Sequence, residues 1–254
     1  MENLKLGIQM YALREDFHKD PYKTFKMVKE MGYSGVEFDY TSLELKASDY
    51  KAALIECGLE CYGVLADWEY LQPDALADVM RYNHELGNDK LIIGAVPPEE
   101  LVTAADAPVK VLSYMKELYT LLSKDGFVTG YHNHDSDFTM RYKGVPFYEY
   151  VMENTSDDFL MVLDTGNAMA GGANPIDLIK KYPNRTNIIH IKGYSQDKKY
   201  LTPIWESDID WKDVIDTAIK FGKAKFIDVE FGLRGEYIPM ERAELSAKWL
   251  IQNI

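Results

Sequence analysis

Short apolar runs recur along the chain. Each is followed by a polar turn and then by a segment whose apolar residues are spaced three and four apart. The first pattern is typical of a buried strand and the second of an amphipathic helix. Eight such pairs can be recognised. The predicted strands cover residues 5–11, 35–40, 59–66, 90–96, 126–132, 159–164, 187–192 and 224–230.

Successive strands start about 30 residues apart, which suits one strand, one helix and two loops. Eight βα units build either a closed barrel or an open doubly wound sheet. The open sheet is disfavoured because the first strand, around Gly7 and Gln9, is not followed by a Gly-x-Gly-x-x-Gly turn. No linker rich in Pro, Gly or Ser interrupts the pattern. We therefore predict a single α/β domain over residues 1–254, a (β/α)8 or TIM barrel.

Two segments carry local signals. Asn174 and Pro175 predict the start of a helix, because asparagine caps the first amides and proline fits the first helical position. Residues 195–208 form the longest irregular stretch, which follows the seventh strand on the face where barrel loops carry function.

Charge excludes several partners. The chain has 41 acidic and 28 basic residues, a net charge of −13 that repels nucleic acid and anionic lipid. It has no leader pattern and no apolar run of about 18 residues, so we expect no membrane contact and a cytoplasmic protein. Cys57 and Cys61 lack a second pair that would complete a zinc site, and we expect both to be reduced. Association into a homo-oligomer stays open.

The candidate chemistry lies at the carboxyl ends of the last four strands, where barrel enzymes place their catalytic residues. His132, Asp164, His190 and Glu230 end these strands in turn. Imidazole and carboxylate ligands together indicate one divalent cation, with Mn²⁺, Zn²⁺, Co²⁺, Fe²⁺ and Mg²⁺ all open. His134 shares a strand face with His132. We expect His132 to be the ligand and His134 to contact substrate.

Several motifs together resemble one known family. They are Tyr131-His132-Asn133-His134-Asp135, Leu163-Asp164-Thr165-Gly166-Asn167, His190-Ile191-Lys192 and Asp208-Ile209-Asp210-Trp211. The chain resembles the sugar phosphate isomerase/epimerase family of xylose isomerase-like TIM barrels, over essentially its whole length. The motifs are specific for the fold and the metal site, and poorly specific for the substrate.

The resemblance implies that Asp164, His190 and Glu230 bind the metal, with His132 as the fourth ligand. Ketose epimerases of this superfamily have a glutamate at the fourth position, so this chain departs from them there. The apurinic endonucleases of the superfamily need a histidine-rich trinuclear site. The five histidines of this chain cannot furnish that site.

The expected activity is isomerisation or epimerisation of a ketose or keto-sugar through a metal-polarised carbonyl and an enediolate. Glu230 is a candidate base. Glu206, on the loop after the seventh strand, is a second acid or base if that loop folds over the mouth. Lys192 lies two residues past His190 and can stabilise the enediolate oxygen, or it can form a salt bridge inside the barrel.

Substrate contacts are expected from further residues near the strand ends. Trp68 and Trp205 offer aromatic faces to a sugar ring. Gln9 ends the first strand. Glu37 can touch substrate, although a buried ion pair with Lys or Arg is the alternative. No phosphate-binding glycine loop is visible, so an unphosphorylated substrate is expected, with Arg234 as the residue that could bind a phosphate.

Two other functions stay open. One is a metal-dependent lyase or hydrolase of 3-keto-glycosides, which uses the same polarised carbonyl to expel a leaving group. The other is a non-catalytic sugar-binding barrel.

Overall fold

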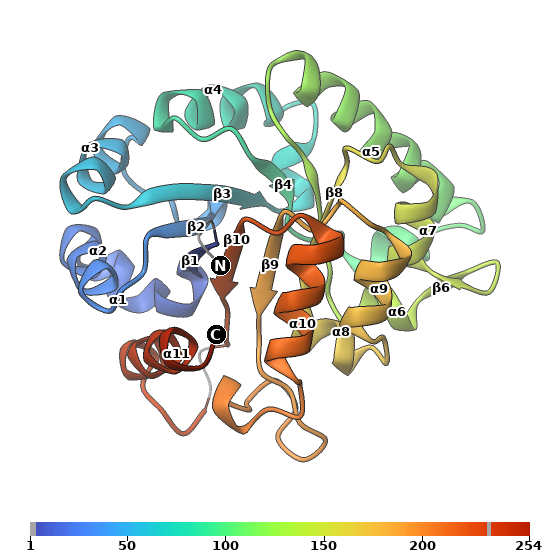
Figure 1. Ribbon diagram of the computed structural model, residues 1–254. Coiled ribbons are helices and arrows are strands. Elements are labelled where there is room, and N and C mark those ends of the chain that lie inside the picture. Colours follow the sequence, from blue (N-terminus) through green and yellow to red (C-terminus); the bar gives the residue numbers. More distant parts are fainter. Residues whose placement is uncertain (1–3, 233–234) are drawn as a thin grey trace.

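Eight parallel strands close into a barrel in the computed structural model, which describes residues 4–232 and 235–254 (Figure 1). The barrel strands are β1 (Lys5–Gln9), β2 (Gly35–Asp39), β3 (Glu60–Ala66), β4 (Leu91–Ile93), β5 (Gly130–His132), β8 (Leu160–Asp164), β9 (Ile188–Ile191) and β10 (Phe226–Val229). Neighbours in the barrel follow the order of the chain, and β10 pairs with β1 to close it. The predicted closed barrel is confirmed, and each strand lies within or close to its predicted range.

Helices surround the barrel in an outer layer (Figure 1). They are α1 (Arg14–Lys19), α2 (Pro21–Glu30), α3 (Ala47–Cys57), α4 (Leu76–Leu86), α5 (Ala107–Lys124), α7 (Phe147–Asn154), α9 (Pro175–Lys181), α10 (Trp211–Thr217) and α11 (Pro239–Asn253). As predicted, Asn174 caps α9, and its side chain accepts hydrogen bonds from Ile176 N at 2.8 Å and Asp177 N at 3.3 Å. No helix within the described ranges is both long enough and apolar enough to cross a membrane.

Short elements follow the strands at the mouth of the barrel. The first four strands each lead into a 3₁₀ turn: Met10–Leu13, Tyr40–Ser42, Trp68–Leu71 and Pro98–Leu101. Two short helices, α6 (Ser136–Thr139) and α8 (Thr165–Ala170), follow β5 and β8. A hairpin of β6 (Arg141–Tyr142) and β7 (Val145–Pro146) lies between α6 and α7. These turns and short helices follow the strand ends, so they determine which side chains face the mouth of the barrel.

The barrel interior changes from apolar to charged along its axis. Leu65, Ile92, Leu160, Val162 and Ile188 form a buried cluster that packs against Phe226. Alternate residues of a strand share one face, so Asp228 and Glu230 continue the inward face that begins at Phe226. The charged residues therefore gather towards the carboxyl ends, above an aliphatic base.

Candidate metal centre

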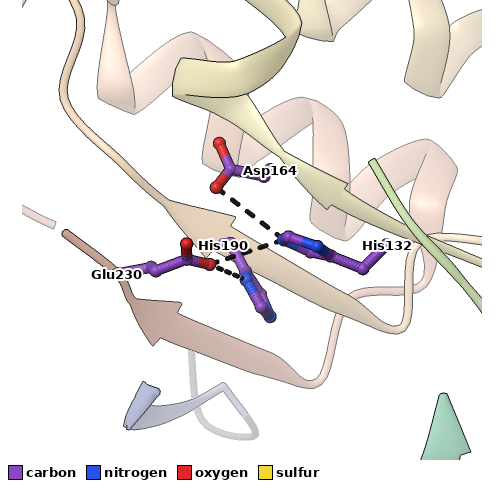
Figure 2. A group of neighbouring side chains, drawn as sticks. All are labelled: His132, Asp164, His190 and Glu230. Carbon is purple, nitrogen blue, oxygen red and sulfur yellow. Dashed lines mark hydrogen bonds and ion pairs between the residues drawn. The ribbon is translucent and has the colours of Figure 1, made fainter. Parts of the chain in front are cut away.

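Four side chains meet at the carboxyl ends of β5, β8, β9 and β10 (Figure 2). Nδ1 of His190 lies 2.6 Å from Oε2 of Glu230. Nε2 of His132 lies 3.4 Å from that same oxygen and 3.8 Å from Oδ2 of Asp164. One potential ligand atom from each residue lies within 4.8 Å of the other three. The structure thus brings together the four residues that the sequence predicts as ligands.

The hydrogen bonds around this cluster leave cation-binding atoms free. Oδ1 of Asp164 accepts a hydrogen bond from Asn167 N at 2.7 Å, whereas Oδ2 is buried and makes no hydrogen bond, with Nζ of Lys192 3.3 Å away. Nδ1 of His132 lies 3.3 Å from the carbonyl oxygen of Gly94, so a proton on Nδ1 leaves the lone pair on Nε2. Nε2 is likewise buried, makes no hydrogen bond of regular geometry, and lies 3.4 Å from Oε2 of Glu230. Buried polar atoms are rarely left without a partner, so this donor set fits a divalent cation.

The two histidines at the end of β5 occupy different positions. His132 is 2% exposed and lies in the cluster. The ring of His134 lies 5.0 Å from the ring of His132, nearly perpendicular to it, and lines the adjoining cavity. Burial, together with the charge of His132, lowers the pKa of His134 to about 4. His134 is therefore neutral near pH 7 and can donate or accept a hydrogen bond.

Lys192 links the cluster to the cavity. Its Nζ lies 2.9 Å from Oε1 of Glu230 and 3.3 Å from Oδ2 of Asp164. Burial alone would raise the pKa of Glu230, but the charge of Lys192 and hydrogen bonds from His132 and His190 hold it well below its ordinary value. Burial would lower the pKa of Lys192, and the two carboxylates reverse this effect. Glu230 is thus an ionised carboxylate beside a cation.

A second set of carboxyl groups lies behind His190. Oε2 of Glu37 lies 2.8 Å from Nε2 of His190, and both side chains are wholly buried. Asp228 is also wholly buried, and burial, with the charge of Glu37, raises its pKa well above the ordinary value. Glu37 does not line the cavity, so its position does not support the predicted contact with substrate. Its partner is a histidine rather than the lysine or arginine of the alternative interpretation.

A cavity of about 350 Å³ opens directly above the cluster. It is lined by Gln9, Tyr11, Asp39, Leu65, Asp67, Gly94, Ala95, His132, His134, Lys192 and Glu230. An adjoining recess of about 310 Å³ shares Asp67, Ala95 and His134 with it and is also lined by Trp68. The predicted substrate residues Gln9 and His134 therefore lie at the cavity, with Lys192 and Glu230 beside them.

Other predicted site residues lie elsewhere. Glu206 pairs with Lys198, with Oε2 of Glu206 2.7 Å from Nζ, and does not line the cavity. Trp205 packs edge-on against Tyr237, with ring centroids 5.3 Å apart, beside a separate surface groove. Their positions do not support the predicted roles in proton transfer and sugar stacking, because Glu206 pairs within the loop after β9 and Trp205 packs against Tyr237, which follows β10. Trp68 borders the recess but is 8% exposed. Arg234 lies outside the described residues.

Two cavity residues escaped the sequence analysis. Asp39 ends β2 and Asp67 directly follows β3. Burial, together with the charge of Asp39, raises the pKa of Asp67 to about 6. The signal was present, because the rule that selects polar residues at the ends of the last four strands also selects these two.

The protein is a closed βα barrel with a cluster of histidine and carboxylate side chains at its mouth. The comparison with protein families identifies the same kind of barrel. Residues 25–253 match the family model described as xylose isomerase-like TIM barrel, so the chain belongs to that family. A search of curated proteins gives no match.

Solved structures resemble this fold over nearly its whole length. A sugar phosphate isomerase/epimerase from Parabacteroides distasonis has a TM-score of 0.81 at 20% identity, with 98% of this chain and 93% of that chain covered. A probable 3-DHS dehydratase from Bacillus anthracis has a TM-score of 0.78 at 12% identity, covering 99% and 100%. The 3-keto-D-glucoside 4-epimerase of E. coli has a TM-score of 0.70 at 19% identity, covering 98% and 99%. At these identities the likeness shows the fold.

Proposed function

We propose that this protein is a metal-dependent sugar isomerase or epimerase that acts on a ketose or keto-sugar. One observation carries the proposal. A buried set of His132, Asp164, His190 and Glu230 opens into a cavity of about 350 Å³, and two of its potential ligand atoms, Nε2 of His132 and Oδ2 of Asp164, make no regular hydrogen bond. The family and the structural neighbours named as sugar isomerases or epimerases support the same class of substrate.

Four side chains would bind the cation, through Nε2 of His132, Nδ1 of His190, Oδ2 of Asp164 and Oε2 of Glu230. When bound, a divalent cation acts as a Lewis acid that makes the C–H bond beside a carbonyl more acidic. In this structure Nδ1 of His190 contacts Glu230 at 2.6 Å, and Oε2 of Glu37 lies 2.8 Å from Nε2 of the same ring. With a cation bound at Nδ1, the ring proton would stand on Nε2, facing Glu37.

The chain supplies the proton transfer. Glu230 is ionised and lines the cavity, so its carboxylate can take the proton from the substrate carbon. Nζ of Lys192, next to Glu230, can stabilise the negative charge that develops on the substrate oxygen. Return of the proton to the neighbouring carbon gives isomerisation. Delivery of a proton to the opposite face of the same carbon gives epimerisation.

The test is exchange of a substrate C–H proton with solvent deuterium, followed by NMR over a panel of ketoses and keto-sugars. Exchange is expected with Mn²⁺ and is lost with a chelator. Glu230→Gln should slow exchange by about 10²–10⁴-fold, the usual contribution of a general base. Glu153→Gln is the matched control, because Glu153 pairs with Lys181 on the outer surface. The absence of metal-dependent exchange across the whole panel would refute the proposal.

A second candidate function is a lyase or hydrolase of 3-keto-glycosides. It is favoured by His132, which stands where ketose epimerases have a second carboxylate, so Glu230 is the main base of the cluster. A single base suffices when loss of a proton is followed by departure of a leaving group. In the same assay a 3-keto-glycoside would then release its aglycone at the rate of proton loss. Sugar binding that is indifferent to metal, with no exchange, would instead indicate a binding protein.

A further inference from the structure

The wall of the cavity supplied by β1, β2 and β3 consists of Gln9, Asp39 and Asp67. The three residues occupy equivalent places, since each stands where a strand leads into a 3₁₀ turn. In the barrel these strands follow β10, the strand that leads to Glu230. The wall therefore begins beside Glu230 and extends away from the metal cluster. All three residues line the same cavity as His132 and Lys192.

The hydrogen bonds of Gln9 and Asp39 leave one donor group and one acceptor atom free. Gln9 is 3% exposed, and its Oε1 accepts a hydrogen bond from Tyr11 N at 2.6 Å. Its amide nitrogen donates no hydrogen bond within the described parts of the chain. Oδ1 of Asp39 accepts from Thr41 N at 2.8 Å and from Thr41 Oγ1 at 2.6 Å, which leaves Oδ2 available.

Asp67 differs from the other two residues. Its side chain makes no capping hydrogen bond to the turn that follows it. It also forms no ion pair with the residues that the structure describes. Its pKa, raised to about 6 by burial and by Asp39, allows it to exchange a proton near neutrality. A partly buried carboxyl group with no structural partner that lines a cavity is available to a ligand.

The charge of the cavity narrows the class of ligand. Lys192 is the one lysine or arginine among the described residues that line it, and it lies on the side of the metal cluster, beside Glu230 and Asp164. The adjoining recess adds Glu69 and Asp135 to its lining and no lysine or arginine. A phosphate group on this side of the cavity would meet carboxylates, and juxtaposed like charges oppose binding.

We propose that Gln9, Asp39 and Asp67 form a subsite for hydroxyl groups, which selects an uncharged polyhydroxy sugar over its phosphorylated counterpart. Sugar hydroxyls donate to the two carboxyl groups and accept from the amide of Gln9. The inference rests on the proposed function and specifies its substrate class. The substrate proposed here differs from the phosphorylated sugar that the name of the Parabacteroides distasonis neighbour suggests.

The test measures binding by saturation-transfer NMR to matched pairs: D-fructose and D-fructose 6-phosphate, D-tagatose and D-tagatose 6-phosphate, and D-ribulose and D-ribulose 5-phosphate. Each pair is measured with Mg²⁺ and after chelation. The test variant is Asp39→Asn combined with Asp67→Asn, because asparagine keeps the shape and hydrogen-bonding capacity but removes the charge. Asp216→Asn is the control, since Asp216 pairs with Lys212 on the surface of α10.

The free sugar of at least one pair is expected to bind about tenfold more tightly than its phosphate, and the double variant should lose most of that preference. A preference for the phosphorylated member, or a preference that the double variant leaves unchanged, overturns the inference while the proposed function stands. If Arg234→Ala removes a preference for phosphate, the phosphate is bound by the segment after β10 instead. If no sugar of any pair binds in the presence of Mg²⁺, the proposed function fails, and the inference fails with it.

Discussion

Substitution of Glu37 by glutamine tests the idea that this residue positions a metal ligand. The contact from Oε2 of Glu37 to Nε2 of His190 is 2.8 Å, and Nδ1 of the same ring lies 2.6 Å from Glu230. Glutamine keeps the shape of the side chain but replaces a charged acceptor by a neutral one. Carboxylates behind a ligating histidine typically contribute 10–100-fold to metal affinity. The Glu37→Gln protein should therefore bind Zn²⁺ or Co²⁺ about 10–100-fold more weakly, a loss of about 1.4–2.7 kcal/mol.

The assay is competition for Zn²⁺ against a chromophoric chelator, with the absorption of bound Co²⁺ as a check on geometry. Asp164→Asn provides the reference for removal of a ligand, and Glu60→Gln, in an exposed pair with Lys5, provides the control for a charge change. Circular dichroism confirms that each variant is folded. Affinity within threefold of the unmodified protein would show that Glu37 does not position His190. A loss as complete as that of Asp164→Asn would show that Glu37 is itself a ligand, and either result refutes the reasoning.

Three further predictions concern stability and rate. A Cβ atom on Gly7 would lie 2.0 Å from Oδ1 of Asp228, so Gly7→Ala should lower the free energy of unfolding by about 3 kcal/mol in a urea titration. Burial raises the pKa of Asp67 to about 6, so its contribution to stability is full below about pH 4 and is lost as the pH rises through 6. Asp67→Asn should thus be more stable than the unmodified protein at pH 8, by about 1 kcal/mol after screening at this partly exposed site, with no difference at pH 4. Glu206→Gln should leave the deuterium exchange rate within twofold, because Glu206 pairs with Lys198 away from the cavity; a tenfold loss would restore its predicted role.

The barrel and the clustering of four polar side chains at its mouth could be predicted because both depend on periodicity. In a closed barrel the ends of parallel strands meet at one mouth whatever the loops do, so His132, Asp164, His190 and Glu230 had to converge. Asp39 and Asp67 obey the same rule, and applying it to the first half of the chain would have found them. Their positions carry no additional signal in a single sequence.

The predicted roles that the structure does not support concern residues whose contacts periodicity does not describe. Glu206 and Trp205 lie on the loop after β9, and their directions depend on contacts with Lys198 and Tyr237. Glu37 points inward, as its position on β2 requires. Its contact with His190 also requires that the two side chains lie at the same depth in the barrel, although β1 and β10 stand between β2 and β9. Such pairings come from three-dimensional packing rather than from the order of residues.

The residues proposed for metal binding and those proposed for sugar recognition come from two separate parts of the chain. The four potential metal ligands come from residues 132–230, whereas the carboxylate and amide wall comes from residues 9–67. Glu37 crosses this division, because it lies on β2 and contacts His190 on β9. Exchange of the turns after β1, β2 and β3 between relatives, with Glu37 retained, should therefore change which compound is accepted while the metal content stays the same. The first quarter of the chain is the natural target for redirecting specificity by recombination.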